Sequence, residues 1–159
     1  MKALDEMVLT EKPFVLMVDD DLGLLDMAGE VLKSDYAVSF AASGPEALEL
    51  IRGGFIPAII LLDIDMPEKS GMHLLSEIKS LDGGIQVIML TDLVNITTVL
   101  EALRCGAEAC LFKPFGQDNQ LMDAVTDCFR KIDRWWGSFR DLTQRRQVSL
   151  AGGRVETLL

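Results

Sequence analysis

The chain has few of the residues from which metal-binding and disulfide frameworks are usually built. Its 159 residues include three cysteines and one histidine. Cys105, Cys110 and Cys128 show no metal-ligand spacing and no framework of pairs, which favours reduced thiols and a cytoplasmic location. We interpret His73 as an ordinary helical residue. The sequence therefore argues against a metal-binding or disulfide-stabilised framework built from these residues.

Long hydrophobic runs, internal repeats and low-complexity segments are also missing. The longest apolar run, residues 55–62, is far too short to span a bilayer. The N-terminus has no signal-peptide pattern, so we expect no membrane association. A hydrophobic content of 49% is too high for a disordered chain, and the length predicts one domain with a sizeable core.

What the chain does have is short apolar runs that end in carboxylates. Residues 58–62 are typical of a strand buried on both faces, and Asp63 follows at once. A similar run, residues 14–18, ends at Asp19 and Asp20. Ligands bind at the carboxyl ends of parallel strands, where gathered carboxylates repel one another unless a cation lies among them. Clustered Asp oxygens are a typical setting for Mg²⁺.

The acidic residues also have purely structural interpretations. Asp63 on its own could simply start a turn. Asp21 precedes apolar residues at helical spacing, and we expect it to cap a helix. Asp19 and Asp20 precede that cap and are therefore better candidates for the site.

Two more apolar runs end in polar residues. Residues 85–90 lead into Thr91, and residues 109–112 lead into Lys113. A hydroxyl and an ammonium group beside a carboxylate–Mg²⁺ cluster can bind the oxygens of a phosphoryl group carried by Asp63. Each signal is weak alone, but the four strand ends together predict a phosphoryl-binding site.

Strands and helices alternate along the chain, which predicts a parallel sheet with helices on both faces. We expect strands near 14–18, 36–40, 58–62, 85–90 and 109–112, and helices near 22–33, 45–52, 71–81, 94–105 and from 117 onward.

These motifs resemble the receiver domain of two-component response regulators, chemotaxis regulators among them, over roughly residues 13 to 131. The matching segments are Val18-Asp19-Asp20, Leu62-Asp63-Ile64-Asp65-Met66-Pro67 with Gly71, Leu90-Thr91 and Lys113-Pro114-Phe115. The resemblance implies an α/β, flavodoxin-like doubly wound (βα)5 fold, with a five-stranded parallel sheet in the order 2-1-3-4-5.

The resemblance also implies the roles of individual residues. Asp63 would accept a phosphoryl group from a histidine kinase or a phosphotransfer protein, and Lys113 would pair with a phosphate oxygen. Thr91 would be the switch hydroxyl. Mg²⁺ would be held by Asp19, Asp20, Asp63 and the backbone carbonyl of Asp65.

Two positions depart from the family pattern. The aromatic switch residue, three positions before Lys113, is Cys110 here, and the usually small residue after Thr91 is Asp92. We therefore expect phosphorylation to cause only modest rearrangement near Cys110, with signalling through the loop that contains Asp92.

Three functions are compatible with these residues. The first is a signalling receiver, which is no metabolic enzyme and catalyses only its own phosphotransfer and autodephosphorylation. The second is a phosphatase resembling haloacid dehalogenases, suggested by the spacing of Asp63 and Asp65. In those enzymes the acidic pair comes late in the chain and a cap domain is needed, for which 159 residues leave no room. The third is a pseudo-receiver that only binds proteins, supported by Cys110 and Asp92.

The C-terminal part extends the expected domain. We divide the chain into an N-terminal arm (1–12), a receiver domain (13–131) and a helical extension with a flexible tail (132–159). Residues 1–128 have 8 Lys/Arg and 22 Asp/Glu, net −14, whereas residues 129–159 have 7 and 3, net +4. Apolar residues recur at spacings of 4 and 3, typical of a heptad seam. They are Leu121, Val125, Cys128, Ile132, Trp135, Phe139 and Leu142.

Two interpretations of this extension remain open. One is a solvated helix that ends at Gly137 and Ser138, since glycine destabilises helices. The other is a longer helix that forms a homodimer or leads into an output region, favoured by Trp135 and Trp136. We expect no direct binding of nucleic acid.

Overall fold

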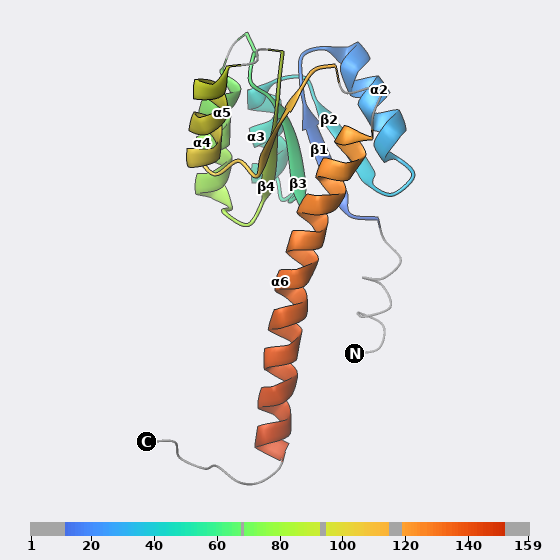
Figure 1. Cartoon of the computed structure of the whole chain (residues 1–159), viewed down its shortest axis with the longest axis vertical. Helices are drawn as coiled ribbons and strands as arrows, with labels where there is room; N and C mark the ends of the chain where they lie inside the picture. The colour runs from blue at the N-terminus through green and yellow to red at the C-terminus, as the bar shows by residue number, and fades with distance from the viewer. Residues whose placement is uncertain (1–11, 68, 93–94, 115–118, 152–159) are drawn as a thin grey trace.

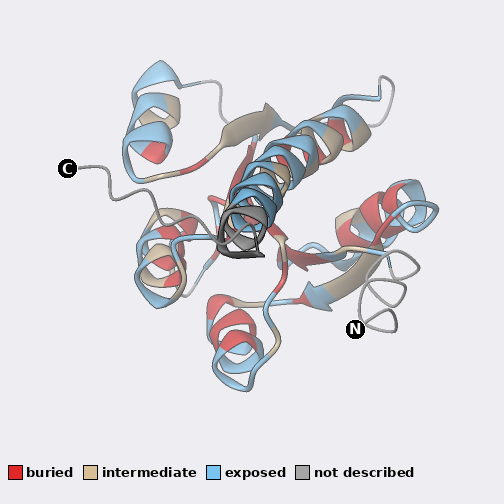
Figure 2. Cartoon of the chain, turned by 90° about the horizontal axis from the view of Figure 1, so that it is seen from below, coloured by how far each residue is buried: buried red, intermediate tan, exposed pale blue. Residues whose placement is uncertain are grey.

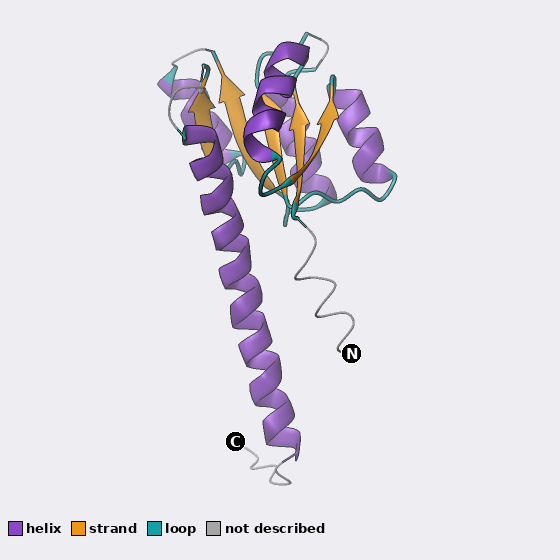
Figure 3. Cartoon of the chain, turned by 90° about the vertical axis from the view of Figure 1, so that its right-hand side faces the viewer, coloured by secondary structure: helices purple, strands orange, loops and turns teal. Residues whose placement is uncertain are grey.

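The computed structural model describes residues 12–67, 69–92, 95–114 and 119–151. Within them, a parallel sheet lies between two layers of helices (Figures 1 and 3), and its five strands have the order β2-β1-β3-β4-β5. The strands are β1 (Phe14–Val18), β2 (Ala37–Ala41), β3 (Ile59–Asp63), β4 (Gln86–Thr91) and β5 (Ala109–Phe112). The helices are α2 (Leu22–Leu32), α3 (Gly44–Arg52), α4 (Gly71–Leu81), α5 (Ile96–Arg104) and α6 (Gln120–Ala151). The predicted fold class and strand order are confirmed.

The central strand β3 is buried along its whole length, as its apolar sequence predicted. Its side chains alternate between the faces of the sheet. Leu61 lies in the core between the sheet and helices α2 and α6, and Leu62 in the core beneath α3, α4 and α5. Figure 2 shows the buried faces of these helices turned toward the sheet. Because both faces are covered, polar chemistry is confined to the ends of the strands.

Side chains cap the helices that start at the carboxyl edge of the sheet. Asp21 caps α2, where its Oδ1 accepts a hydrogen bond from the backbone N–H of Leu24 at 3.2 Å. Ser43, Ser70 and Asn95 cap α3, α4 and α5 in the same way. The predicted cap at Asp21 is therefore confirmed. Helix α5 begins at Ile96, and the expected start at 94 lies outside the described residues.

Gly71 lets α4 begin in direct contact with the end of β3. A Cβ atom at this position would lie 2.2 Å from the carbonyl oxygen of Asp63. The Gly71 N–H donates a hydrogen bond to the carbonyl of Ile64 at 2.9 Å. The requirement for glycine is a close approach of two backbones, since positive φ angles occur, among the described glycines, at Gly54 and Gly106.

Helix α6 runs far beyond the sheet (Figure 1). Its 32 residues correspond to roughly 48 Å. Of the two interpretations left open for this segment, the helix that ends at Gly137 and Ser138 is wrong, because both residues lie inside the continuous helix. One glycine costs a helix only about 1 kcal/mol relative to alanine, and the Ser138 hydroxyl donates a hydrogen bond to the carbonyl of Arg134 at 3.0 Å.

Parts of the expected N- and C-terminal segments, and the expected start of α6 at 117, lie outside the described residues. Of the predicted arm, the structure describes Lys12, whose ammonium group donates a hydrogen bond to the carbonyl of Lys33 at 2.8 Å. Of the predicted extension, α6 accounts for residues up to Ala151. Among the described helices, none is both long and apolar enough to cross a membrane.

Candidate functional site

Four strand ends meet at the carboxyl edge of the sheet. In the register, Val18 lies opposite Leu62, and Asp63 lies opposite Leu90. Thr91 is the last residue of β4, and Lys113 directly follows β5. The strands therefore present the side chains that follow or end them to one place, as the sequence predicted.

Lys113 joins two buried carboxylates. Its ammonium nitrogen lies 2.8 Å from Asp19 Oδ2 and 3.2 Å from Asp63 Oδ1. Asp19 and Asp63 are 1% and 2% exposed, so these ion pairs are shielded from water. Charge-assisted contacts of this kind hold all three groups in fixed positions.

Backbone amides also hold the same two carboxylates. The N–H of Asp21 donates to Asp19 Oδ1 at 2.9 Å, and the N–H of Asp65 donates to Asp63 Oδ1 at 3.2 Å. The contacts that Asp63 makes with the Asp65 N–H and with Lys113 are thus both made to Oδ1. The turn after β3 orients Asp63 through the backbone and does not require the Asp65 side chain.

Burial and neighbouring charge set the protonation of the site. Burial raises the pKa of Asp63, and the nearby Asp19 charge raises it further, against the opposing effects of the Asp65 N–H and Lys113. Burial acts to lower the pKa of Lys113, but the hydrogen bond to Asp19 and the charges of Asp63 and Asp19 outweigh it and raise that pKa. Lys113 therefore stays cationic between its two partners.

The acidic cluster fits a small divalent cation. Asp19, Asp20 and Asp63 each offer a carboxylate oxygen, and these oxygens all lie within 4.8 Å of one another. Asp20 is exposed, so water can reach the cluster beside the two buried carboxylates. An all-oxygen donor set with access to water is what Mg²⁺ prefers. For Asp65, the N–H contact to Asp63 is recorded, and the role of its carbonyl as a ligand stays a prediction.

Thr91 is buried at the end of β4, one strand away from Asp63. Its carbonyl accepts the Lys113 N–H at 2.9 Å. Because side chains alternate along a strand, Thr91 shares a face with Met89 and with Cys110, which packs on that face from β5. Burial raises the pKa of the Cys110 thiol. Asp92, the other departure from the family pattern, is exposed.

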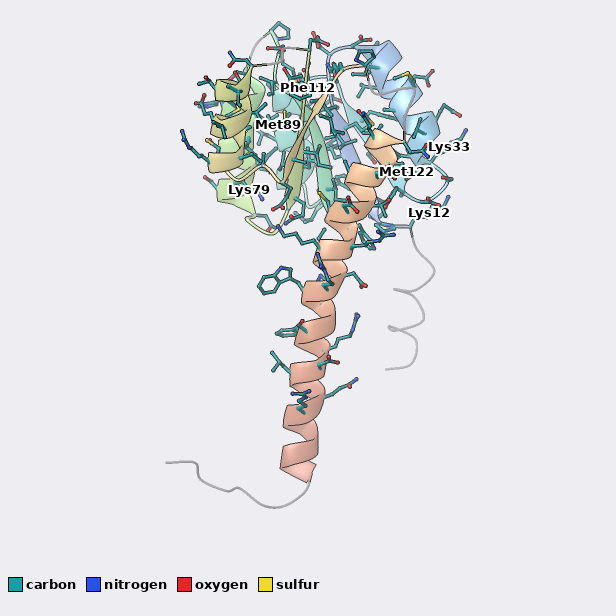
Figure 4. The ribbon with its side chains drawn as sticks, in the orientation of Figure 1. Lys12, Lys33, Lys79, Met89, Phe112 and Met122 are labelled. Carbon is teal, nitrogen blue, oxygen red and sulfur yellow. The ribbon has the colours of Figure 1, made fainter. Side chains whose placement is uncertain are left out.

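Phe112 is a residue near the site that the sequence pattern did not single out. This residue lies directly opposite Thr91 in the register and, by alternation, on the same face. Its side chain is 38% exposed at the edge strand (Figure 4). The available signal was its position two residues after Cys110, which places an aromatic ring on the face where the aromatic switch was expected.

Comparisons with known proteins agree with this geometry. Residues 15–126 match the response regulator receiver domain. The chemotaxis protein CheY of Halobacterium salinarum is 33% identical, over 71% of this chain and 93% of its own length. The transcriptional regulatory protein ZraR of Escherichia coli is 37% identical over 66% of this chain, which covers only 24% of ZraR.

Solved structures show the same similarity. A CheY-like receiver domain from Methanospirillum hungatei is 28% identical, with a TM-score of 0.69 over 80% of this chain and 99% of its own. The receiver domain of a LuxO repressor protein from Vibrio parahaemolyticus is 26% identical, with a TM-score of 0.72 over 83% and 97%. The chain belongs to the response regulator receiver domain family, whose members are signalling domains and bind Mg²⁺ at an acidic pocket.

Proposed function

We propose that this chain is a phosphorylation switch in which Asp63 accepts a phosphoryl group from the phosphohistidine of a histidine kinase or a phosphotransfer protein. The observation that carries the proposal is the bridge from Lys113 to both Asp19 and Asp63, beside the exposed Asp20. We assign the receiver function to residues 13–131.

In the proposed transfer, Asp63 Oδ2 attacks phosphorus, because the Asp65 N–H and Lys113 both contact the other oxygen, Oδ1. A P–O bond forms, the P–N bond to the histidine breaks, and the imidazole keeps the electron pair of that bond. Lys113 offers its ammonium group to a phosphoryl oxygen. When bound, Mg²⁺ would neutralise phosphoryl charge, and Asp20 and Asp63 would ligate it directly, with Asp19 and the Asp65 carbonyl completing the site.

The response to phosphorylation would begin at Thr91, whose hydroxyl would turn toward the new phosphoryl oxygens. Cys110 has no ring to follow this movement. Phe112, which faces Thr91 across the strand pair, is the aromatic group placed to respond. We therefore propose modest rearrangement at Cys110, with signalling through Phe112 and the Asp92 loop.

The phospho-acceptor is tested by incubating the chain with acetyl phosphate and Mg²⁺. We expect one acid-stable, hydroxylamine-labile phosphate, and its loss in Asp63→Asn. Asp82→Asn is the matched control, because Asp82 lies in the turn before β4 and an asparagine oxygen can still accept its hydrogen bond from Gly84. Undiminished labelling of Asp63→Asn would refute the assignment. A folded wild-type chain that takes up no phosphate would instead favour the pseudo-receiver alternative.

The metal site is tested separately by titrating Mg²⁺ without phosphate and following amide shifts by NMR. A site with few protein ligands and several waters binds at about millimolar concentration. Asp20→Ala removes a carboxylate of the cluster and should weaken binding by about tenfold or more. Asp21→Ala removes only the cap of α2 and should leave binding within about threefold. Equal losses in both variants would mean that ligand and cap have been assigned wrongly.

Two further expectations remain proposals. We place the chain in the cytoplasm, because Cys105, Cys110 and Cys128 are free thiols. Besides the phosphoryl donor, its proposed partner is a second copy of the same chain, and we propose no direct contact with nucleic acid.

A further inference from the structure

The second half of α6 carries apolar side chains that no described part of the chain covers. Trp135, Trp136, Phe139 and Leu142 are 74%, 59%, 58% and 65% exposed. Trp136 and Phe139 contact each other edge to face, with ring centroids 6.1 Å apart. Figure 4 shows side chains projecting from this part of the helix with no other described element beside them. A cluster of this kind marks an interaction surface.

We propose that residues 132–142 form a parallel, two-stranded coiled coil with the same residues of a second copy. In the heptad, Ile132 and Phe139 occupy a positions, and Trp135 and Leu142 occupy d positions. The opposite side of the helix is polar, and there Asp133 and Arg140 form an ion pair. One face of the extension is thus apolar and the other is suited to water.

The charges beside the seam favour a parallel arrangement. In a parallel pair, residues at g face residues five positions later at e of the other chain. Lys131 would then face Trp136, and Ser138 would face Thr143, with no like charges opposed. In the antiparallel register that stacks Trp135 on Phe139, Arg145 would lie beside the ion pair of Lys131 and Glu108 and add a second cation there.

The receiver domain, residues 13–131, is the head of the molecule, and its contacts with α6 determine where the seam begins. Lys131 forms an ion pair with Glu108 at 2.5 Å, and Ile132 still packs against the core. The helix therefore leaves the sheet in a defined direction, and both heads of a parallel pair lie at the same end.

The available area favours an interface of the smaller kind. Three aromatic side chains and a leucine, each more than half exposed, offer roughly 500 Å² per chain, or roughly 1,000 Å² for the pair. Area of this order suits a dimer that exchanges at micromolar concentrations. No residue of the acidic site lies in the seam, so the dimer does not depend on phosphotransfer.

Sedimentation of the 159-residue chain at concentrations up to about 200 μM tests the dimer. We expect reversible dimerisation, with a dissociation constant raised about 30-fold or more by Phe139→Glu. Gln144→Glu, on the outer face of the same helix, introduces the same charge change and should alter the constant by less than about threefold. A chain that stays monomeric, or a dimer unaffected by Phe139→Glu, overturns the proposal.

Cross-linking tests the orientation in a Cys105→Ser background, which removes the exposed native thiol. In a parallel pair Leu142 faces its own copy, whereas in the antiparallel register it faces Ile132. When oxidised glutathione is added as the oxidant, the Leu142→Cys variant should therefore form a disulfide between its two chains. The glutathione takes up the two electrons and two protons and becomes two reduced glutathiones. Gln144→Cys should not. Equal cross-linking of both variants, or of neither, would contradict the parallel register.

Discussion

The two halves of helix α6 have the same heptad spacing of apolar residues, but they differ in how far those residues are buried. In the first half, Leu121 and Val125 are buried against the sheet, at 2% and 0% exposure. In the second half, Phe139 and Leu142 continue the stripe and remain more than half exposed. Periodicity therefore predicts that a helix has an apolar face, but it does not identify what covers that face.

The two parts of the chain on either side of Cys128 also differ in net charge. The segment up to Cys128 has a net charge of −14, and the segment after it +4. The negative segment includes the acidic site, where Lys113 stands between two buried carboxylates. The positive segment is helical as far as Ala151 and exposes its apolar stripe. Chemistry is thus confined to one region, and the other is suited to association.

The largest expected difference between the two halves is in the free energy of unfolding, measured for one leucine-to-alanine substitution in each half. Leu121→Ala deletes buried methyl groups and leaves a cavity, which should lower the free energy of unfolding by about 2–5 kcal/mol. Leu142→Ala touches an exposed side chain and should change it by less than about 0.5 kcal/mol. Urea denaturation at low micromolar concentration, where the seam is unpaired, measures both.

An equal loss of stability in both variants would show that the second half of α6 is packed against the domain. The comparison between the halves would then fail. If Leu142→Ala matters only at high protein concentration, the exposed stripe is an interface between chains, because only the paired state then depends on it.

A smaller effect is expected where the head requires a glycine. Gly71→Ala places a Cβ atom 2.2 Å from the Asp63 carbonyl oxygen, so α4 or β3 has to move. We expect the free energy of unfolding to fall by about 1–3 kcal/mol or more, as in other overpacked sites. Because the backbone contact involves Asp63, labelling by acetyl phosphate should also slow. Wild-type stability and labelling together would mean that the close approach at Gly71 is not required.

The sequence predicts the fold and the location of the site well, because both depend on local patterns. Apolar runs that end in Asp63 or Thr91 indicate buried strands and also the edge at which their polar residues gather. The contact between Lys113 and Asp19 was not predicted, because it depends on side-chain distances across strands that are not neighbours. Phe112 was missed for a similar reason, since its position opposite Thr91 depends on register.

The end of α6 shows a different reason for failure. The low helix propensity of glycine makes Gly137 a possible end of the helix, yet the helix continues to Ala151. A single residue costs about 1 kcal/mol, and the propensities of the residues around it can offset that cost. Helix ends are decided by sums over a window and by caps, which one residue does not reveal.

The smallest predicted effect has the opposite sign to that of Gly71. A Cβ atom at Gly137 would meet nothing within 4 Å, and the residue occupies the outward f position of the heptad. Gly137→Ala should therefore stabilise the helix by up to about 1 kcal/mol, because alanine loses less backbone entropy. Circular dichroism should show α6 melting at a higher temperature. Sedimentation should show a dissociation constant lowered by up to about fivefold, because a more stable helix loses less conformational entropy when it pairs. Unchanged labelling of Asp63 is the control that separates this effect from the site. A destabilised variant would mean that the chain uses the flexibility of Gly137, and that the second half of α6 is not the regular helix on which the seam depends.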